Sequence, residues 1–258
     1  MELQKVCFSY NKQNELLNMI STTIKTGKIT TIIGPNGSGK STLLSVMSKL
    51  HRPSSGEVLL DGKSLHACKP KEVAKRIAVV YQQNEVPNDL TVEKLVHYGR
   101  IPYKGLLTYG KGKDSDHSVV EWAINCTNLS TKKDALVSSL SGGERQRVWI
   151  AMALAQKTDF LFLDEPTTYL DMYHQIELLE LVQKLNHQYN MTIVMVLHDL
   201  NQAIRYSDQL IVMKDGEIFK EGPPKEIVTE KLVKTIYNVE VALRDCQDYG
   251  RYIVPVGI

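Results

Sequence analysis

The residues most able to do chemistry form a glycine-rich loop after an apolar run at 29–33. The loop and the residue that follows it are Gly34, Pro35, Asn36, Gly37, Ser38, Gly39, Lys40, Ser41 and Thr42. Glycines there permit backbone angles that turn successive amide N–H groups inward, and a helix start adds the positive end of its dipole. The lysine of such a loop reaches the β- and γ-phosphates of a nucleotide, and the serine hydroxyl binds Mg²⁺. The flanking strand and helix patterns favour a phosphate-binding loop over a chance turn.

Carboxylates and a histidine follow two other apolar runs. Asp164 and Glu165 come directly after 160–163, where Asp164 would hold Mg²⁺ and Glu165 could polarise an attacking water. His198 follows 192–197 and could contact the γ-phosphate or orient the water. The alternatives are an acidic pair that caps the next turn and a hydrogen-bonded histidine at a sheet edge. The phosphate-binding loop makes the first of these alternatives weak.

A second glycine-rich segment, Leu140 to Glu144, precedes an expected helix. Ser141 is a good N-cap, and Gly142 and Gly143 leave the first amides bare, so the helix start is another anion site. The phosphate-binding loop already surrounds its own nucleotide. This second site could therefore serve a γ-phosphate bound to another copy of the chain, and the alternative is an ordinary helix cap.

Strand and helix patterns alternate around these residues and predict an α/β fold with a parallel sheet. The expected buried strands are 29–33, 77–80, 160–163 and 192–197, and the expected helices include 41–50, 175–186 and 200–206. Asp61-Gly62 and Asp215-Gly216 each predict a tight hairpin.

Two further regions complete the expected organisation. Between 84 and 156 we expect a helical insertion with helices at 92–97, 116–127 and 144–156 and a loop at 99–105. After 223 we expect one helix near 225–237 and a short strand.

Composition excludes several classes of protein. The chain has 258 residues, 43% hydrophobic and 23% charged, with a net charge of +2 that gives no reason to expect a nucleic-acid partner. No apolar stretch approaches the roughly 20 residues of a membrane helix, and the N-terminus lacks the form of a signal peptide, so we expect a cytosolic chain. The four scattered cysteines favour reduced thiols over a zinc site.

In family order, these motifs resemble those of the ATP-binding subunits of ABC transporters over essentially the whole chain. The resemblance implies that Tyr10 stacks on adenine, that Gln82 senses Mg²⁺, and that Asp171 belongs to the D-loop. It also implies that Ser141, Gly142 and Gly143 belong to the signature motif and that His198 is the switch histidine. The implied fold is a RecA-like P-loop NTPase core (1–83 and 157–258) with a mixed sheet, an antiparallel β-subdomain and an inserted α-helical subdomain (84–156).

The same resemblance implies partners and cofactors. Two copies, or a pair of ATPase subunits, would meet head to tail around ATP and Mg²⁺. The pair would bind integral-membrane permease subunits at the cytoplasmic face of the membrane, as a peripheral component, and would work indirectly with an extracellular substrate-binding lipoprotein. Two features depart from the family pattern: Tyr169 stands where a small residue is common, and Gln83 adjoins Gln82, so either glutamine could be the Q-loop residue.

The absence of a fused membrane segment favours an importer with separate permeases. Segments such as 98–103, 147–156, 164–171 and 198–203 look closest to the ferric-siderophore, haem and cobalamin group, and within it to siderophore subunits. Haem or cobalamin import remains the alternative. A soluble ABC ATPase of DNA repair or translation, a P-loop kinase or GTPase, and a non-catalytic scaffold fit the sequence less well.

Overall fold

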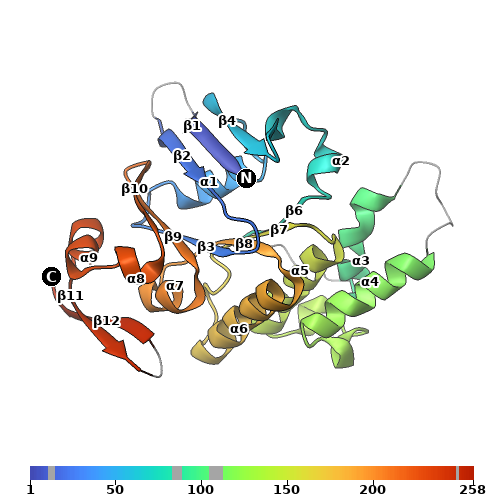
Figure 1. Cartoon of the computed structure of the whole chain (residues 1–258). Helices are drawn as coiled ribbons and strands as arrows, with labels where there is room; N and C mark the ends of the chain where they lie inside the picture. Colours follow the sequence, from blue (N-terminus) through green and yellow to red (C-terminus); the bar gives the residue numbers. More distant parts are fainter. Residues whose placement is uncertain (11–14, 83–88, 105–112, 248–249) are drawn as a thin grey trace. The chain divides into compact units, whose positions relative to one another are not determined.

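The computed structural model describes residues 1–10, 15–82, 89–104, 113–247 and 250–258 (Figure 1). Gln83 and residues 84–88 and 105–112 lie outside the described residues. The chain divides into two compact units, which we describe one at a time. The first unit comprises Met1–Cys68 and Leu185–Ile258, and the second comprises Lys69–Lys184.

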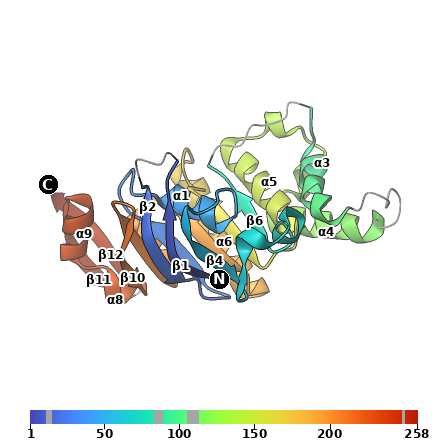
Figure 2. The same ribbon diagram turned by 90° about the horizontal axis from the view of Figure 1, so that it is seen from above.

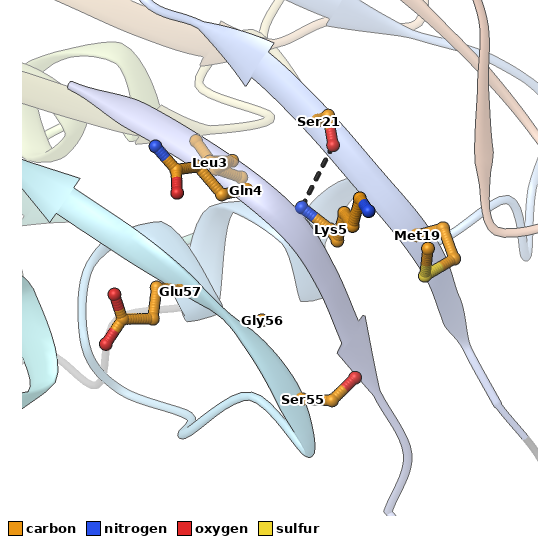
Figure 3. Close-up of a pocket in the computed structure, with 8 residues that line it drawn as sticks. All are labelled: Leu3, Gln4, Lys5, Met19, Ser21, Ser55, Gly56 and Glu57. Atoms are coloured by element: carbon orange, nitrogen blue, oxygen red, sulfur yellow. Dashed lines mark hydrogen bonds between the residues drawn. The ribbon is translucent and has the colours of Figure 1, made fainter.

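An antiparallel sheet of order β2-β1-β4-β5 begins the first unit. Its turn between β4 and β5 has Asp61 at φ 51° and Gly62 at φ 74°, the two positive values of a type I′ hairpin, which confirms the predicted turn. Figure 3 shows a hollow on this sheet, where the Lys5 N–H donates to Ser21 Oγ over 2.9 Å. The strands are β1 (Glu2–Phe8), β2 (Leu17–Thr23), β4 (Ser55–Leu60) and β5 (Lys63–Ser64).

A second sheet in this unit has the order β10-β9-β3-β8. Its central strand β3 (Ile29–Ile33) runs parallel to β8 (Thr192–Val196) and to β9 (Gln209–Lys214), and β3 and β8 are buried along their whole length. The near-continuous apolar runs in the sequence follow from that burial. Asp215-Gly216 turns the chain from β9 into β10 (Glu217–Gly222), as predicted. Helices α1 (Lys40–Met47) and α7 (Leu200–Tyr206) follow β3 and β8.

The C-terminal part of this unit differs from the prediction in two ways. The single expected helix is divided into α8 (Pro224–Ile227) and α9 (Glu230–Tyr237), because Val228 is extended and the Thr229 hydroxyl caps α9. The expected single strand is an antiparallel hairpin of β11 (Glu240–Cys246) and β12 (Gly250–Gly257) beside α9 (Figure 2). The Asn201 side chain of α7 fastens β12 by bonding both the N–H and the carbonyl of Ile253, at 2.8 and 3.1 Å.

The second unit contains the parallel pair β6 (Ile77–Val80) and β7 (Phe160–Asp164) and most of the helices. Helices α3, α4 and α5 pack on one another (Figure 2) and lie within one or a few residues of their predicted bounds. The unit boundary falls inside α6. The helices are α2 (Pro70–Val73), α3 (Val92–His97), α4 (Lys113–Cys126), α5 (Gly142–Ala155) and α6 (Met172–Tyr189), with 3₁₀ turns at Leu65–Ala67 in the first unit and at Tyr98–Tyr103, Ser130–Lys132 and Val137–Ser139 in the second.

A buried arginine fastens the 3₁₀ turn Tyr98–Tyr103, most of which lies within the expected loop at 99–105. Arg100 pairs with Asp116 of α4 at 2.8 Å and donates to the Ala155 carbonyl at the end of α5 at 2.7 Å, while its guanidinium lies 3.9 Å from the centre of the Tyr103 ring. These bonds satisfy the last carbonyl of α5 and hold three elements of the second unit together. The predicted subdomain limits at 84 and 156 stay a prediction.

Candidate functional site

Tight packing sets the conformation of the 34–41 loop between β3 and α1. Gly34 and Gly39 have φ angles of 153° and 94°, which residues with a side chain rarely adopt. A Cβ at Gly34 would also lie 2.2 Å from the Met213 carbonyl oxygen, and one at Gly39 would lie 2.9 Å from the Leu17 side chain. Gly39 is the N-cap of α1, so the loop delivers bare backbone amides at a helix N-terminus.

Lys40 is held over the same loop. Its ammonium donates to the carbonyl oxygens of Gly34 and Pro35, each at 2.9 Å, and the residue is only 5% exposed. A buried ammonium fixed above inward-facing amides is a binding arrangement for phosphate oxygens. Ser41 follows in the first turn of α1, and its hydroxyl is an oxygen donor predicted for Mg²⁺.

His198 leaves the sheet at the same edge as the phosphate-binding loop. β3 and β8 are parallel neighbours with Ile32 opposite Val196, so the segments after both strands emerge together at their carboxyl ends. His198 is exposed, and the Asp199 carboxylate after it caps α7 by accepting the Gln202 N–H at 2.7 Å. This cap orients the turn that carries the histidine.

Tyr10 presents an aromatic ring to solvent. The residue is 61% exposed, its ring meets Phe8 edge to face at 5.0 Å, and its hydroxyl lies 3.2 Å from His51 Nε2. The ring is thus supported on one side and open on another, as stacking on a planar base requires. Nothing in the sequence distinguished His51 from the other histidines.

In the second unit, Gln82 and Glu165 meet at the ends of two parallel strands. Val80 lies opposite Leu163 in the β6–β7 pair, and Gln82 Nε2 donates to Glu165 Oε2 at 2.7 Å. The Thr168 hydroxyl donates to the same oxygen at 3.3 Å, and Glu165 itself has a positive φ of 48°. Such backbone strain in a non-glycine residue is typical of functional sites. Asp164, the last residue of β7, is buried.

The second glycine-rich segment forms a complete capping box. Ser141 Oγ accepts the Glu144 N–H at 3.3 Å, and Glu144 Oε2 accepts the Ser141 N–H at 3.0 Å. The Lys132 ammonium donates to the other oxygen of Glu144. The hydrogen bond from Lys132, followed by that from Ser141, lowers the pKa of the Glu144 carboxyl to about 2.

Asp171 caps the N-terminus of α6, where its carboxylate accepts the His174 N–H at 3.0 Å. Tyr169, just before it, has a φ of 65° and is 83% exposed. Among the described residues, the tyrosine side chain is therefore largely open to solvent, at a position where the family resemblance implies a small residue.

The predicted site residues are thus divided between the two units. The phosphate-binding loop, Tyr10 and His198 belong to the first unit. The second unit carries Gln82, Asp164, Glu165, the 141–143 turn and Asp171.

The predicted metal donors fit Mg²⁺ by their chemistry. Ser41, Gln82 and Asp164 are oxygen donors, which Mg²⁺ prefers. Within the described residues, no group of three or more His, Cys, Asp or Glu side chains could hold a metal ion.

A phosphate-binding loop after a buried strand, with a strand-end carboxylate, defines a P-loop nucleotide-binding protein. The ABC transporter family matches residues 17–168. The petrobactin import ATP-binding protein FpuC of Bacillus anthracis is 46% identical, over 93% of this chain and 88% of its own length. The ferric enterobactin transport ATP-binding protein FepC of Escherichia coli K12 is 44% identical, over 98% and 93%.

Solved structures share the fold. CbiO1 of Clostridium perfringens, part of the ABC transporter complex cbiONQ, superposes with a TM-score of 0.80 at 29% identity, covering 91% of this chain and 94% of that one. The dimeric structure of MJ0796, a bacterial ABC transporter cassette, superposes with a TM-score of 0.74 at 30% identity, covering 86% and 98%.

The chain belongs to the ABC transporter family. It is an ATP-binding subunit of an importer and an ATPase, with the predicted RecA-like fold. Subunits of this kind work as paired cassettes with membrane permease subunits, to which they attach peripherally. In the part of the chain that the structure describes, no helix has the length and apolar character needed to span a membrane.

The capping box yields a pH prediction. Because the pKa of Glu144 falls from 4.5 to about 2 on folding, its stabilising contribution is present above pH 4.5 and is lost as the pH falls towards 2. Glu144→Gln keeps a capping group but loses the charge, so the free energy of unfolding should fall by about 1 kcal/mol or less at neutral pH.

Urea unfolding of the wild type and the variant, at neutral pH and at about pH 3, measures this difference. The difference in the free energy of unfolding between the wild type and Glu144→Gln should narrow in acid. Glu57→Gln, at an exposed position, should not differ from the wild type at either pH. A difference of constant size would show that the charge of Glu144 does not stabilise the fold.

Proposed function

We propose that this chain hydrolyses MgATP to power the import of ferric siderophores through separate permease subunits. The observation that carries the proposal is the high identity, over nearly the whole chain, to ATP-binding proteins named for petrobactin and ferric enterobactin. A cobalamin import ATP-binding protein of Halobacterium salinarum is 40% identical over 88% of this chain, but the match spans only 56% of that protein. Cobalamin, or haem, is therefore the second candidate.

In the first unit, the phosphate-binding loop binds the nucleotide. Its amides and the Lys40 ammonium bind phosphate oxygens, and the exposed Tyr10 ring stacks on adenine. When bound, Mg²⁺ would neutralise phosphate charge, and Ser41, Asp164 and Gln82 are the predicted donors that would hold it. The Gly34 and Gly39 contacts keep the amides in place before the nucleotide arrives.

Glu165 and His198 activate the attacking water. The carboxylate of Glu165 accepts the attacking water's proton, and the hydrogen bonds from Gln82 and Thr168 orient it for that task. His198, on the edge beside the phosphate-binding loop, orients the water or the γ-phosphate. Phosphoryl transfer depends chiefly on positioning and charge stabilisation, which these groups provide.

Completion of the site needs a second copy. The capped turn 141–143 presents amides at the N-terminus of α5, and we assign them to the γ-phosphate bound by the partner cassette. We assign Asp171, which caps α6, to the same interface. The known dimer of the similar cassette MJ0796 supports this assignment. Residues 84–156 form the subdomain that binds the permease at the cytoplasmic face, and an extracellular lipoprotein delivers the cargo.

Glu165→Gln tests the assigned base. The variant keeps the size and the hydrogen bonds of the side chain but cannot accept a proton, so steady-state turnover should fall at least about 100-fold with ATP affinity unchanged. Gel filtration with MgATP should reveal a trapped dimer. Glu57→Gln is the matched surface control. Undiminished hydrolysis by Glu165→Gln would remove Glu165 from its role.

Ser141→Arg tests the composite site. The bulky charged side chain should block closure on the partner's nucleotide, leaving ATP binding intact and abolishing hydrolysis. Loss of the cap should cost about 1 kcal/mol, which a thermal melt will register. Ser55→Arg, on an exposed strand position, is the control. If Ser141→Arg hydrolysed ATP at the normal rate, one chain alone would suffice for catalysis.

A deletion strain tests the cargo. Uptake of radiolabelled ferric siderophores should be lost on deletion and restored by the wild-type gene but not by Glu165→Gln, while haem and cobalamin uptake stay normal. Loss of cobalamin or haem uptake with normal siderophore uptake would favour the second candidate.

A further inference from the structure

Gly143 packs directly against a histidine of the next helix. The place that a Cβ on Gly143 would occupy is filled by the His174 side chain, whose Cγ, Nδ1 and Cβ would lie 2.6, 2.9 and 3.0 Å away. Gly143 is buried and its φ is not positive, so it is the neighbour rather than the backbone angle that requires glycine here. Gly142 differs: its nearest such contact is Leu170, at 3.9 Å.

His174 is itself held by a charged pair that crosses the two helices. Its Nδ1 lies 3.2 Å from Glu177 Oε2, and the same oxygen accepts a hydrogen bond from the Arg147 guanidinium. Gly143 and Arg147 lie four residues apart on α5, and His174 and Glu177 lie three apart on α6, so each pair shares one helix face. The two faces meet where α5 and α6 lie side by side (Figures 1 and 2).

The same histidine is joined to the D-loop through its backbone. The His174 N–H donates to the Asp171 carboxylate, which caps α6 directly after Tyr169 and Leu170. The contact thus connects two segments of this chain that face the partner copy in the proposed function. One is the 141–143 turn, and the other is the exposed 169–171 segment.

We propose that His174 is a positioning residue: its ring sets the location of the Gly143 amide and fixes the 141–143 turn relative to 169–171. The proposal rests on the composite-site function above. His174 touches no nucleotide in this scheme and acts through Gly143. A displaced turn would misplace an amide aimed at the partner's γ-phosphate, and small misplacements reduce turnover strongly.

Steady-state kinetics of His174→Ala test the proposal. kcat should fall about tenfold, while ATP affinity, which depends on the phosphate-binding loop, stays unchanged. His174→Asn, which can still donate to Glu177, should recover most of the rate. His187→Ala, at an exposed histidine near the other end of α6, is the control. Wild-type kcat in His174→Ala would overturn the proposal.

A double variant tests the contact itself. Gly143→Ala forces a methyl group against the imidazole and should lower kcat. Gly143→Ala/His174→Ala removes the two closest atoms, Cγ and Nδ1, and leaves only the Cβ at 3.0 Å, so it should be more active than Gly143→Ala alone. If the fall in kcat of the double variant equalled the product of the falls of the two single variants, the ring would not position the glycine. If His174→Ala fails to fold, His174→Ser replaces it in both the single-variant and the double-variant comparison.

Ser141→Arg separates this proposal from the proposed function. Normal hydrolysis by Ser141→Arg would reject the composite site. An inactive Ser141→Arg together with a fully active His174→Ala would reject the positioning role alone.

Discussion

In the proposed mechanism, two helix starts in this chain offer bare backbone amides to phosphate oxygens, and much of the structure positions these two turns. An amide approaches an anion most closely where no side chain intervenes, and glycines stand at both helix starts. At α1 the requirement is twofold, because Gly34 and Gly39 combine unusual φ values with neighbours that exclude a Cβ. At α5 the backbone is ordinary, and the His174 ring imposes the glycine. Similar glycine-rich sequences therefore arise from different physical causes.

The carboxyl ends of parallel strands supply the remaining chemistry. His198 emerges beside the phosphate-binding loop because β8 neighbours β3, and Gln82 reaches Glu165 because β6 neighbours β7. In each case two segments far apart in sequence become adjacent only through strand pairing. Glu165 adopts a positive φ directly after β7, and in the proposed mechanism this turn carries the catalytic carboxylate.

The sequence predicted those features whose causes are local. Buried parallel strands appear as continuous apolar runs, and Asp-Gly predicts a type I′ turn wherever it separates two strands, as it does at 61–62 and 215–216. The C-terminal hairpin was missed because its strands, such as Glu240–Cys246, mix charged and apolar residues without a clean alternation. The break between α8 and α9 at Val228 and Thr229 could have been predicted, because a threonine before Glu230 is a normal N-cap signal.

The contacts of His174 could not be read from the sequence at all, because they join residues about thirty positions apart through the packing of two helices. Together with the capping box, those contacts hold the 141–143 turn in place. Glu144 and Lys132 hold it by charge, and His174 holds it by steric contact, both within one chain. In the proposed mechanism, the amides meant for the partner's nucleotide are therefore fixed before the partner arrives. Groups fixed in advance need no reorganisation when charge develops on the transferred phosphoryl group, so more of the interaction stabilises the transition state.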